Sequence, residues 1–152
     1  MLYIASDHAG FQLKKHLIKY LATQLNIQAE DLGPSAYVET DDFVDYAAAL
    51  AKKDAANKEN QGILICRTGH GMCMAANKIP GTRAIVGYSI SGAELGRTHN
   101  DANILCLASG VLSDDHAAAI AKTFLKTNFE PQERFVRRNN KIEELEKSTA
   151  SL

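Results

Sequence analysis

Short apolar runs alternate along the chain with segments whose apolar residues recur at helical spacing. The strand-like runs cover residues 2–6, 27–32, 62–66, 83–88 and 103–108. The helix-like segments cover residues 13–25, 43–58, 72–78, 91–98 and 114–126. Strands that alternate with helices through short connections form a parallel sheet with helices on both faces. The pattern therefore predicts the α/β class, with right-handed crossovers between the strands.

The length of 152 residues suits one compact domain with its own hydrophobic core, so we expect a single domain over residues 1–152. No internal repeat, low-complexity stretch or linker interrupts the pattern. After Glu130 and Pro131 the chain becomes polar and charged, and we expect a C-terminal helix over about residues 131–148.

The charge balance and the cysteines argue against several classes of protein. Seventeen Lys and Arg residues against eighteen Asp and Glu residues give a net charge of -1, which disfavours a general nucleic-acid binder. No apolar run approaches the roughly 20 residues that span a bilayer, and residues 1–7 do not resemble a secretory signal. The three cysteines are not spaced like zinc ligands, so we expect reduced thiols, no metal and a cytoplasmic protein.

In a parallel sheet of this kind, ligands bind at the carboxyl ends of the strands. The densest signal there runs from Cys66 to Met72, where a strand end is followed by Gly69, Gly71 and a predicted helix. Such a turn forms a cradle of backbone N–H groups suited to an anion. The helix end and Arg67 would favour the thiolate of Cys66, which is a candidate base or nucleophile. The alternative is that Cys66 is a small apolar residue ending a core strand.

Three phosphate-binding motifs do not fit this segment. A cysteine phosphatase loop requires an arginine six positions after the cysteine, where this chain has Met72. A nucleotide-binding P-loop requires Gly-Lys followed by Ser or Thr, and a dinucleotide-binding turn requires a third glycine. Neither pattern follows Cys66.

Further candidates lie at other strand and helix ends. Asp7 and His8 follow the first predicted strand and could orient a sugar hydroxyl or pair with a phosphate, although Asp7 could equally cap the first helix. His99 ends a predicted helix and could move a proton or interact with the helix dipole. Arg134 and Arg138 share one face of the C-terminal helix, where they could converge on a phosphate or belong to a solvated charged surface.

Five motifs, in order, resemble those of the type-B ribose-5-phosphate isomerases, a family that includes the galactose-6-phosphate isomerase subunits. They cover residues 6–10, 42–47, 62–66 with 68–69, 75–81 and 99–103. The resemblance spans nearly the whole chain and implies a Rossmann-like three-layer α/β/α sandwich with a five-stranded parallel sheet. It also implies no metal or organic cofactor, and a homodimer or homotetramer with active sites at the subunit interface. The C-terminal helix is then expected to pack on a partner subunit.

The same resemblance implies an aldose–ketose isomerase that interconverts ribose 5-phosphate and ribulose 5-phosphate. The family's cysteine at the position of Cys66 takes the proton from C2 and returns it at C1 through a cis-enediolate. Thr68 matches a residue that assists proton movement between substrate oxygens, and the N–H groups of residues 67–71 match the hole for the enediolate oxygen. Some relatives use a glutamate base at the position of Met72, which leaves Cys66 as the candidate base here.

The remaining roles also come from the resemblance. His99 matches the residue that opens the furanose ring, with Asn100 beside it. Asp7 matches a contact to the ring-opening oxygen. The phosphate-binding positions of the family match His8, Arg134 and Arg138.

The chain departs from the family at four positions. Arg67 stands where relatives usually have Gly, His70 where they have a small apolar residue, and Phe135 where they often have His. Gly110 stands where they commonly carry an arginine that binds phosphate. We expect Arg67 or His70 to supply the positive charge that is missing at Gly110. The competing hypothesis is that the pocket accepts a larger or differently charged sugar.

Two alternatives to a ribose-5-phosphate isomerase remain open. The first keeps the reaction and changes the substrate to a hexose 6-phosphate of the allose or galactose type. The second is a weakly active sugar-phosphate-binding subunit that needs a partner chain. The joint presence of Cys66, Thr68 and His99 favours an active enzyme.

Overall fold

The computed structural model describes residues 1–149 and confirms the α/β class. The strands are β1 (Leu2–Ser6), β2 (Ala29–Asp31), β3 (Gln61–Cys66), β4 (Ala84–Val86) and β5 (Ile104–Ala108). The helices are α1 (Phe11–Gln24), α2 (Phe43–Ala55), α3 (His70–Ala76), α4 (Ile90–Asn100), α5 (Asp114–Lys126) and α6 (Glu133–Thr149). Strands and helices alternate along the chain as predicted, and α6 follows at the end.

Within residues 1–149, the strands form one parallel sheet in the order β2-β1-β3-β5-β4. The central strand β3 pairs with β1 on one side and β5 on the other, with Leu2 opposite Gln61 and Gly62 opposite Ile104. The edge strands β2 and β4 have three residues each and are shorter than their apolar runs predicted. Short edge strands are common because they pair on one side only.

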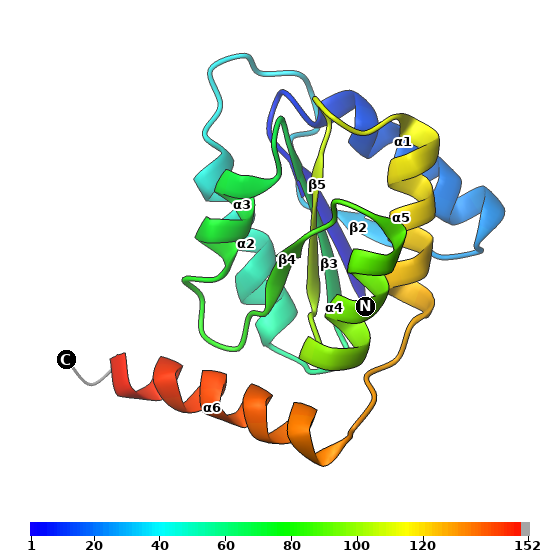
Figure 1. The fold of residues 1–152 in the computed structure, drawn as a ribbon. Coiled ribbons are helices and arrows are strands. Elements are labelled where there is room, and N and C mark those ends of the chain that lie inside the picture. The colour runs from blue at the N-terminus through cyan, green and yellow to red at the C-terminus, as the bar shows by residue number, and fades with distance from the viewer. Residues whose placement is uncertain (150–152) are drawn as a thin grey trace.

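Helices cover both faces of the sheet, which gives the three expected layers (Figure 1). Successive side chains of β3 point to opposite faces. Ile63 and Ile65 belong to the buried cluster that includes residues of α1 and α5, whereas Leu64 and Cys66 belong to the cluster that includes residues of α2 and α3. Continuous apolar strands such as residues 62–66 are required where both faces of a sheet are covered.

The connection between β2 and α2 is tied to the body of the domain by a buried lysine. The Nζ of Lys14, a fully buried residue of α1, donates to Asp31 Oδ1 and to the backbone oxygen of Pro34, each at 2.7 Å. A buried ammonium is tolerated when it is paired and hydrogen-bonded in this way. The connection then continues to Asp41, which lies beside His8 at the end of β1.

The last turn of α4 and the helix α6 lie at the opposite end of the sheet. α4 follows β4 and ends at Asn100, shortly before β5 begins at Ile104, so its last turn is at the amino ends of the strands. α6 crosses this end of the molecule (Figure 1), where the Glu146 carboxylate accepts the N–H of Gly81 at 2.9 Å. None of the helices in residues 1–149 combines the length and apolar character that crossing a membrane requires.

Candidate active site

Cys66 ends β3, and its side chain lies directly in front of the following turn. The backbone N–H of Gly69 donates to Cys66 Sγ at 3.1 Å. Gly69 caps α3 with a φ of 78°, a left-handed conformation that glycine adopts without steric cost. Cys66 is 5% exposed, so its thiol is largely buried in the single chain. An N–H aimed at sulfur stabilises negative charge there, which suits a thiolate.

Thr68 and the first turn of α3 complete this cradle. Thr68 Oγ1 accepts the N–H of His70 at 3.4 Å, and both residues are exposed. A Cβ on Gly71 would lie 2.8 Å from the ring of Phe43, so only glycine lets this aromatic ring of α2 pack so close to the turn. In the part of the chain that the structure describes, the N–H groups of Gly71 and Met72 donate to no protein acceptor.

Arg67 lies against Gly110, in the turn that follows β5. The N–H of Gly110 donates to the backbone oxygen of Arg67 at 2.9 Å. A Cβ at position 110 would lie 2.9 Å from that oxygen and 3.1 Å from Cγ of Arg67. The chain at position 67 therefore occupies the space that a side chain at position 110 would need.

The Asp7-His8 turn lies next to the Cys66 turn because β1 and β3 are neighbours. The N–H of Asp7 donates to the backbone oxygen of Ile65 at 3.2 Å. Asp7 Oδ1 accepts the N–H of Gly10 at 3.0 Å, but Gly10 is itself the N-cap of α1 and no side chain in residues 1–149 caps this helix, so the interpretation of Asp7 as the helix cap is wrong. Burial raises the pKa of Asp7 above its ordinary value, against the lowering effect of the Gly10 hydrogen bond.

His8 is held by Asp41, a residue that the sequence did not single out. Nδ1 of His8 lies 2.7 Å from Asp41 Oδ1, and the same oxygen accepts the backbone N–H of His8 at 3.1 Å. The hydrogen bond to Asp41 raises the pKa of His8. Fixing Nδ1 as the donor to a carboxylate leaves Nε2 available to a ligand. Asp41 thus orients the His8 ring and favours its protonated form.

A second group of predicted residues gathers at the other end of the sheet. The ring of His99 stacks on Phe135 with centroids 4.1 Å apart, and the Arg134 guanidinium carbon lies 4.6 Å from the centroid of the same Phe135 ring. Asn139 Nδ2 donates to the backbone oxygen of His99 at 3.2 Å. Asn100 ends the same helix as His99, and Arg138 is exposed on α6. Phe135 is therefore a platform that the sequence did not identify.

Within one chain these two groups do not meet. Cys66 stands at the carboxyl end of β3, and the last turn of α4 lies at the amino ends. The six residues of β3 span roughly 16 Å at about 3.3 Å per residue. A single small substrate cannot bridge that length within one chain. Among residues 1–149, no group of three or more His, Cys, Asp or Glu side chains could hold a metal ion.

Known proteins resemble the chain over nearly its whole length. The family model described as Ribose/Galactose Isomerase matches residues 2–142. A probable ribose-5-phosphate isomerase B of Mycoplasma genitalium is 45% identical over 150 residues, which cover 97% of each chain. The chain is also 33% identical over 132 residues to D-erythrulose-4-phosphate isomerase 2 of Mycolicibacterium smegmatis, over 86% of this chain and 87% of that one.

Solved structures resemble the whole chain. The ribose-5-phosphate isomerase B of Mycoplasma genitalium with bound ribulose-5-phosphate has a TM-score of 0.91 and 44% identity, over 96% of this chain and 95% of that one. The type B ribose 5-phosphate isomerase of Trypanosoma cruzi has a TM-score of 0.92 and 36% identity, over 97% of each chain.

Proposed function

The chain belongs to the ribose/galactose isomerase family, and from that premise we propose how its residues interconvert ribose 5-phosphate and ribulose 5-phosphate. The observation that carries the mechanism is the position of Cys66 Sγ, at a strand end, 3.1 Å from the N–H of Gly69 and beside the Asp7-His8 turn. The base Cys66, the N–H groups of the turn that follows it and the phosphate-binding His8 then lie on two neighbouring turns.

Cys66 acts as the base on the open-chain sugar. Its thiolate takes the proton from C2, the electrons of the C–H bond form the C1–C2 double bond, and the C1 carbonyl oxygen takes up the negative charge. The thiol then returns the proton to C1, while the hydroxyl proton of O2 moves to O1 and C2 becomes the carbonyl carbon. Thr68, whose hydroxyl is exposed beside the turn, assists the transfer between the two oxygens.

The enediolate is stabilised by backbone dipoles of the same turn. The first-turn N–H groups of α3 at Gly71 and Met72 are the donors, because they have no protein acceptor within residues 1–149. Preorganised donors of this kind are worth about 3 kcal/mol each in well-studied enzymes. Gly69 and His70 hold the turn in the shape that presents these groups, Gly69 by its left-handed backbone and His70 by its bond to Thr68.

The phosphate is bound by His8 on the Cys66 side of the site. The Asp41 carboxylate raises the pKa of His8, which favours the protonated ring, and leaves the second ring nitrogen for a phosphate oxygen. Arg67 adds a second cation, and the support is that its backbone oxygen and Cγ lie next to Gly110. Asp7, whose pKa is raised by burial, contacts the ring oxygen of the closed sugar.

The other half of the site comes from a second copy of the chain. His99 opens the furanose ring, Asn100 stands beside it, and Arg134 and Arg138 bind the phosphate, all from the amino-end group of that copy. Two observations support this proposal. The two groups are separated within one chain, and the stacking of His99 on Phe135 holds the histidine ring in place. A homodimer is the smallest assembly that completes both sites, and α6 of one copy would then pack on the other.

An assay with purified protein tests the base. Ribulose 5-phosphate formation from ribose 5-phosphate is expected with and without a chelator, and the Cys66→Ala variant is expected to lose it. Cys73→Ala is the matched control, since this cysteine lies on α3 and bonds the backbone oxygen of Ala84 instead of facing the turn. Activity that persists in Cys66→Ala would remove Cys66 from the mechanism, and Cys73→Ala is expected to remain active.

The sugar preference is tested with a panel of substrates. Ribose 5-phosphate, allose 6-phosphate, galactose 6-phosphate and erythrulose 4-phosphate are compared by kcat/KM, with the free sugars as controls. Ribose 5-phosphate is expected to be the best substrate, and a hexose or tetrose phosphate that surpasses it would show a changed pocket. We also propose a cytoplasmic location, supported by three free cysteines.

A further inference from the structure

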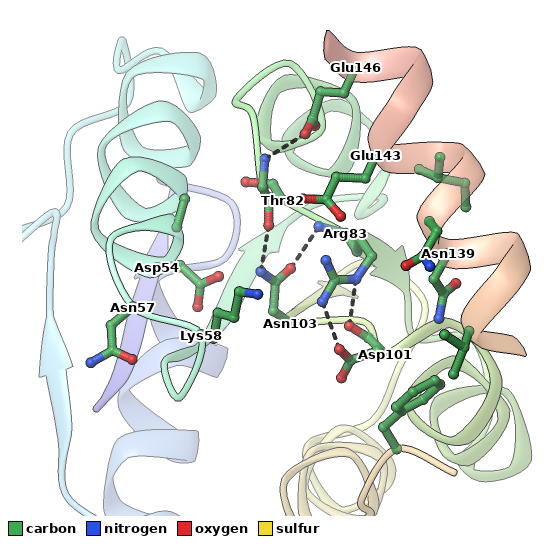
Figure 2. Close-up of a pocket in the computed structure, with 16 residues that line it drawn as sticks. Asp54, Asn57, Lys58, Thr82, Arg83, Asp101, Asn103, Asn139, Glu143 and Glu146 are labelled. Atoms are coloured by element: carbon green, nitrogen blue, oxygen red, sulfur yellow. Dashed lines mark hydrogen bonds and ion pairs between the residues drawn. The ribbon is translucent and has the colours of Figure 1, made fainter. Parts of the chain in front are cut away.

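A cavity of about 270 Å³ lies at the amino end of the sheet, away from Cys66. The end of α2, the turn before β4 and the inner side of α6 enclose it. Figure 2 shows Asp54 on the α2 side, Asn139 and Glu143 on the α6 side, and Arg83 between them. None of these side chains has a role in the proposed isomerisation.

Buried oxygens without partners converge on this cavity. Six buried side-chain oxygens lack a hydrogen-bond partner in residues 1–149, and four of them belong to residues that line it. They are both carboxylate oxygens of Asp54, the hydroxyl of Thr82 and Oδ1 of Asn139. Asp54 is 1% exposed, so bulk water does not solvate it. Buried polar groups are nearly always hydrogen-bonded in native proteins, so these four oxygens call for a bound molecule.

Among residues 1–149, four carboxylates line the cavity, from Asp54, Asp101, Glu143 and Glu146, against the two cations of Lys58 and Arg83. The Arg83 guanidinium donates to the backbone oxygen of Asp101 at 2.8 Å and to Asp101 Oδ2 at 2.9 Å, which leaves N–H groups of its second terminal nitrogen for a ligand. Burial raises the pKa of Asp54 to about 7, with Arg83, the terminal ammonium of Met1 and Arg97 acting in the opposite direction. Asp54 can therefore accept or donate a hydrogen bond near neutral pH.

The unpaired oxygens, Arg83 and the charges of the lining indicate what kind of molecule the cavity binds. The orphan oxygens need O–H or N–H donors, and Arg83 needs an acceptor. An anion would be repelled by the four carboxylates that line the same space, and a cation would leave Arg83 without an acceptor. A hydroxyl group satisfies both kinds of partner because it donates and accepts at once. A cavity of about 270 Å³ has room for a small molecule with several hydroxyls.

We propose that the cavity between α2, the β4 turn and α6 is a second binding site, specific for a small neutral polyol such as an unphosphorylated sugar or sugar alcohol. Asn139 connects this site to the proposed ring-opening residue, because its Nδ2 donates to the backbone oxygen of His99. A polyol bonded to Asn139 Oδ1 and to Asp54 therefore joins α6 to α2.

The test is a titration of the full-length protein with ribitol, followed by amide chemical shifts. Ribitol has no carbonyl and no phosphate, so the measurement does not depend on turnover, and loss of isomerase activity would leave its result unchanged. Saturable shifts are expected at Thr82, Arg83 and Asn139, with a dissociation constant on the order of 1 mM, and not at residues 66–71.

Two variants remove the proposed contacts without enlarging the cavity. Asp54→Leu and Thr82→Val keep similar volume and remove the orphan oxygens, so each is expected to weaken ribitol binding by about tenfold. Asp115→Asn, which removes an exposed carboxylate of α5, is the control and should leave binding unchanged. The proposal is overturned if ribitol gives no saturable shifts, if both variants bind it as the parent protein does, or if spermidine or inorganic phosphate shifts these residues instead.

Discussion

The N–H of Gly69 donates to the sulfur of Cys66 at 3.1 Å, and Gly69 can do so because its backbone is left-handed, with a φ of 78°. The same residue therefore caps α3 and aims a donor at the proposed base. A Cβ at position 69 would meet other atoms only at ordinary contact distances of 3.5 Å. A side chain there is therefore disfavoured by the left-handed backbone and not by a steric clash.

Gly69→Ala is expected to lose about 1–2 kcal/mol of stability, the cost of a left-handed non-glycine residue. Displacement of the N–H from the sulfur should also lower kcat about ten- to a hundredfold. Gly81→Ala is the matched control, because Gly81 has a φ of 84° and similarly open surroundings at the other end of the sheet. Chemical denaturation should show similar losses for both variants, and an unchanged kcat in Gly69→Ala would contradict the role of this hydrogen bond.

Asp41→Asn should change the pH dependence of substrate binding. Asp41 raises the pKa of His8, so in the parent protein the charged imidazolium persists above its ordinary titration near about 6.5. With asparagine the hydrogen bond is retained but the charge is lost, so KM for ribose 5-phosphate should begin to rise at a lower pH. Profiles of KM and kcat against pH measure this. Asp45→Asn, an exposed carboxylate of α2, serves as control; identical KM profiles for Asp41→Asn and the parent would refute the assignment.

Arg67→Ala should raise KM for ribose 5-phosphate about tenfold, with a smaller change in kcat, because one charge-assisted contact to phosphate is lost. Gly110→Ala should have a similar effect, because its Cβ would press on the backbone oxygen and Cγ of Arg67. His70→Ala tests the alternative cation, and Lys122→Ala, on the exposed face of α5, is the control for a lost charge. A KM that is unaffected by Arg67→Ala and raised by His70→Ala would assign the phosphate contact to His70.

Mixing two inactive variants tests the shared site. Cys66→Ala and His99→Ala are each expected to be inactive alone. Random exchange of subunits in a dimer should restore about a quarter of the parent activity, since half of the dimers then contain one intact site of two. Activity is measured after refolding the mixture. A mixture as inactive as its components would show that Cys66 and His99 do not serve the same site.

Stability should fall as the pH rises from about 4 to 7, in part because of Asp54. Its pKa is raised to about 7 in the folded chain and is about 3.9 when unfolded, so the folded state binds more protons in this window. Neutralising the group as Asp54→Leu should remove a penalty on the order of 4 kcal/mol at neutral pH. Urea unfolding at several pH values measures the slope. A slope in Asp54→Leu as steep as in the parent protein would exclude this carboxyl as its source.

The fold could be predicted from the sequence because the patterns that determine it are local. Leu13, Leu17 and Leu21 recur at helical spacing and are all buried, and the apolar run at residues 62–66 is the strand buried on both faces. Boundaries were less predictable: the helix expected over residues 72–78 begins at His70, because the left-handed Gly69 already starts the turn. Nothing in the local pattern marks that conformation.

The site was harder to predict from the sequence because its contacts join distant parts of the chain. Asp41 lies 33 residues from His8, in a connection without a periodic pattern, and its neighbour Asp42 caps α2 instead. Phe135 was noted only as a departure from the family, whereas the structure uses its ring to support His99. The one available signal for Asp41 was a pair of acids before a helix, which does not say which of the two faces a histidine.

The ring of Phe135 contacts both His99 and Arg134, so one aromatic side chain supports the proposed ring-opening group and a proposed anchor for phosphate. A substitution that tilts this ring moves an acid–base group and a cation together. Engineering this chain toward a longer or shorter sugar would therefore have to redesign both functions as a pair, because neither can be shifted while the other stays in place.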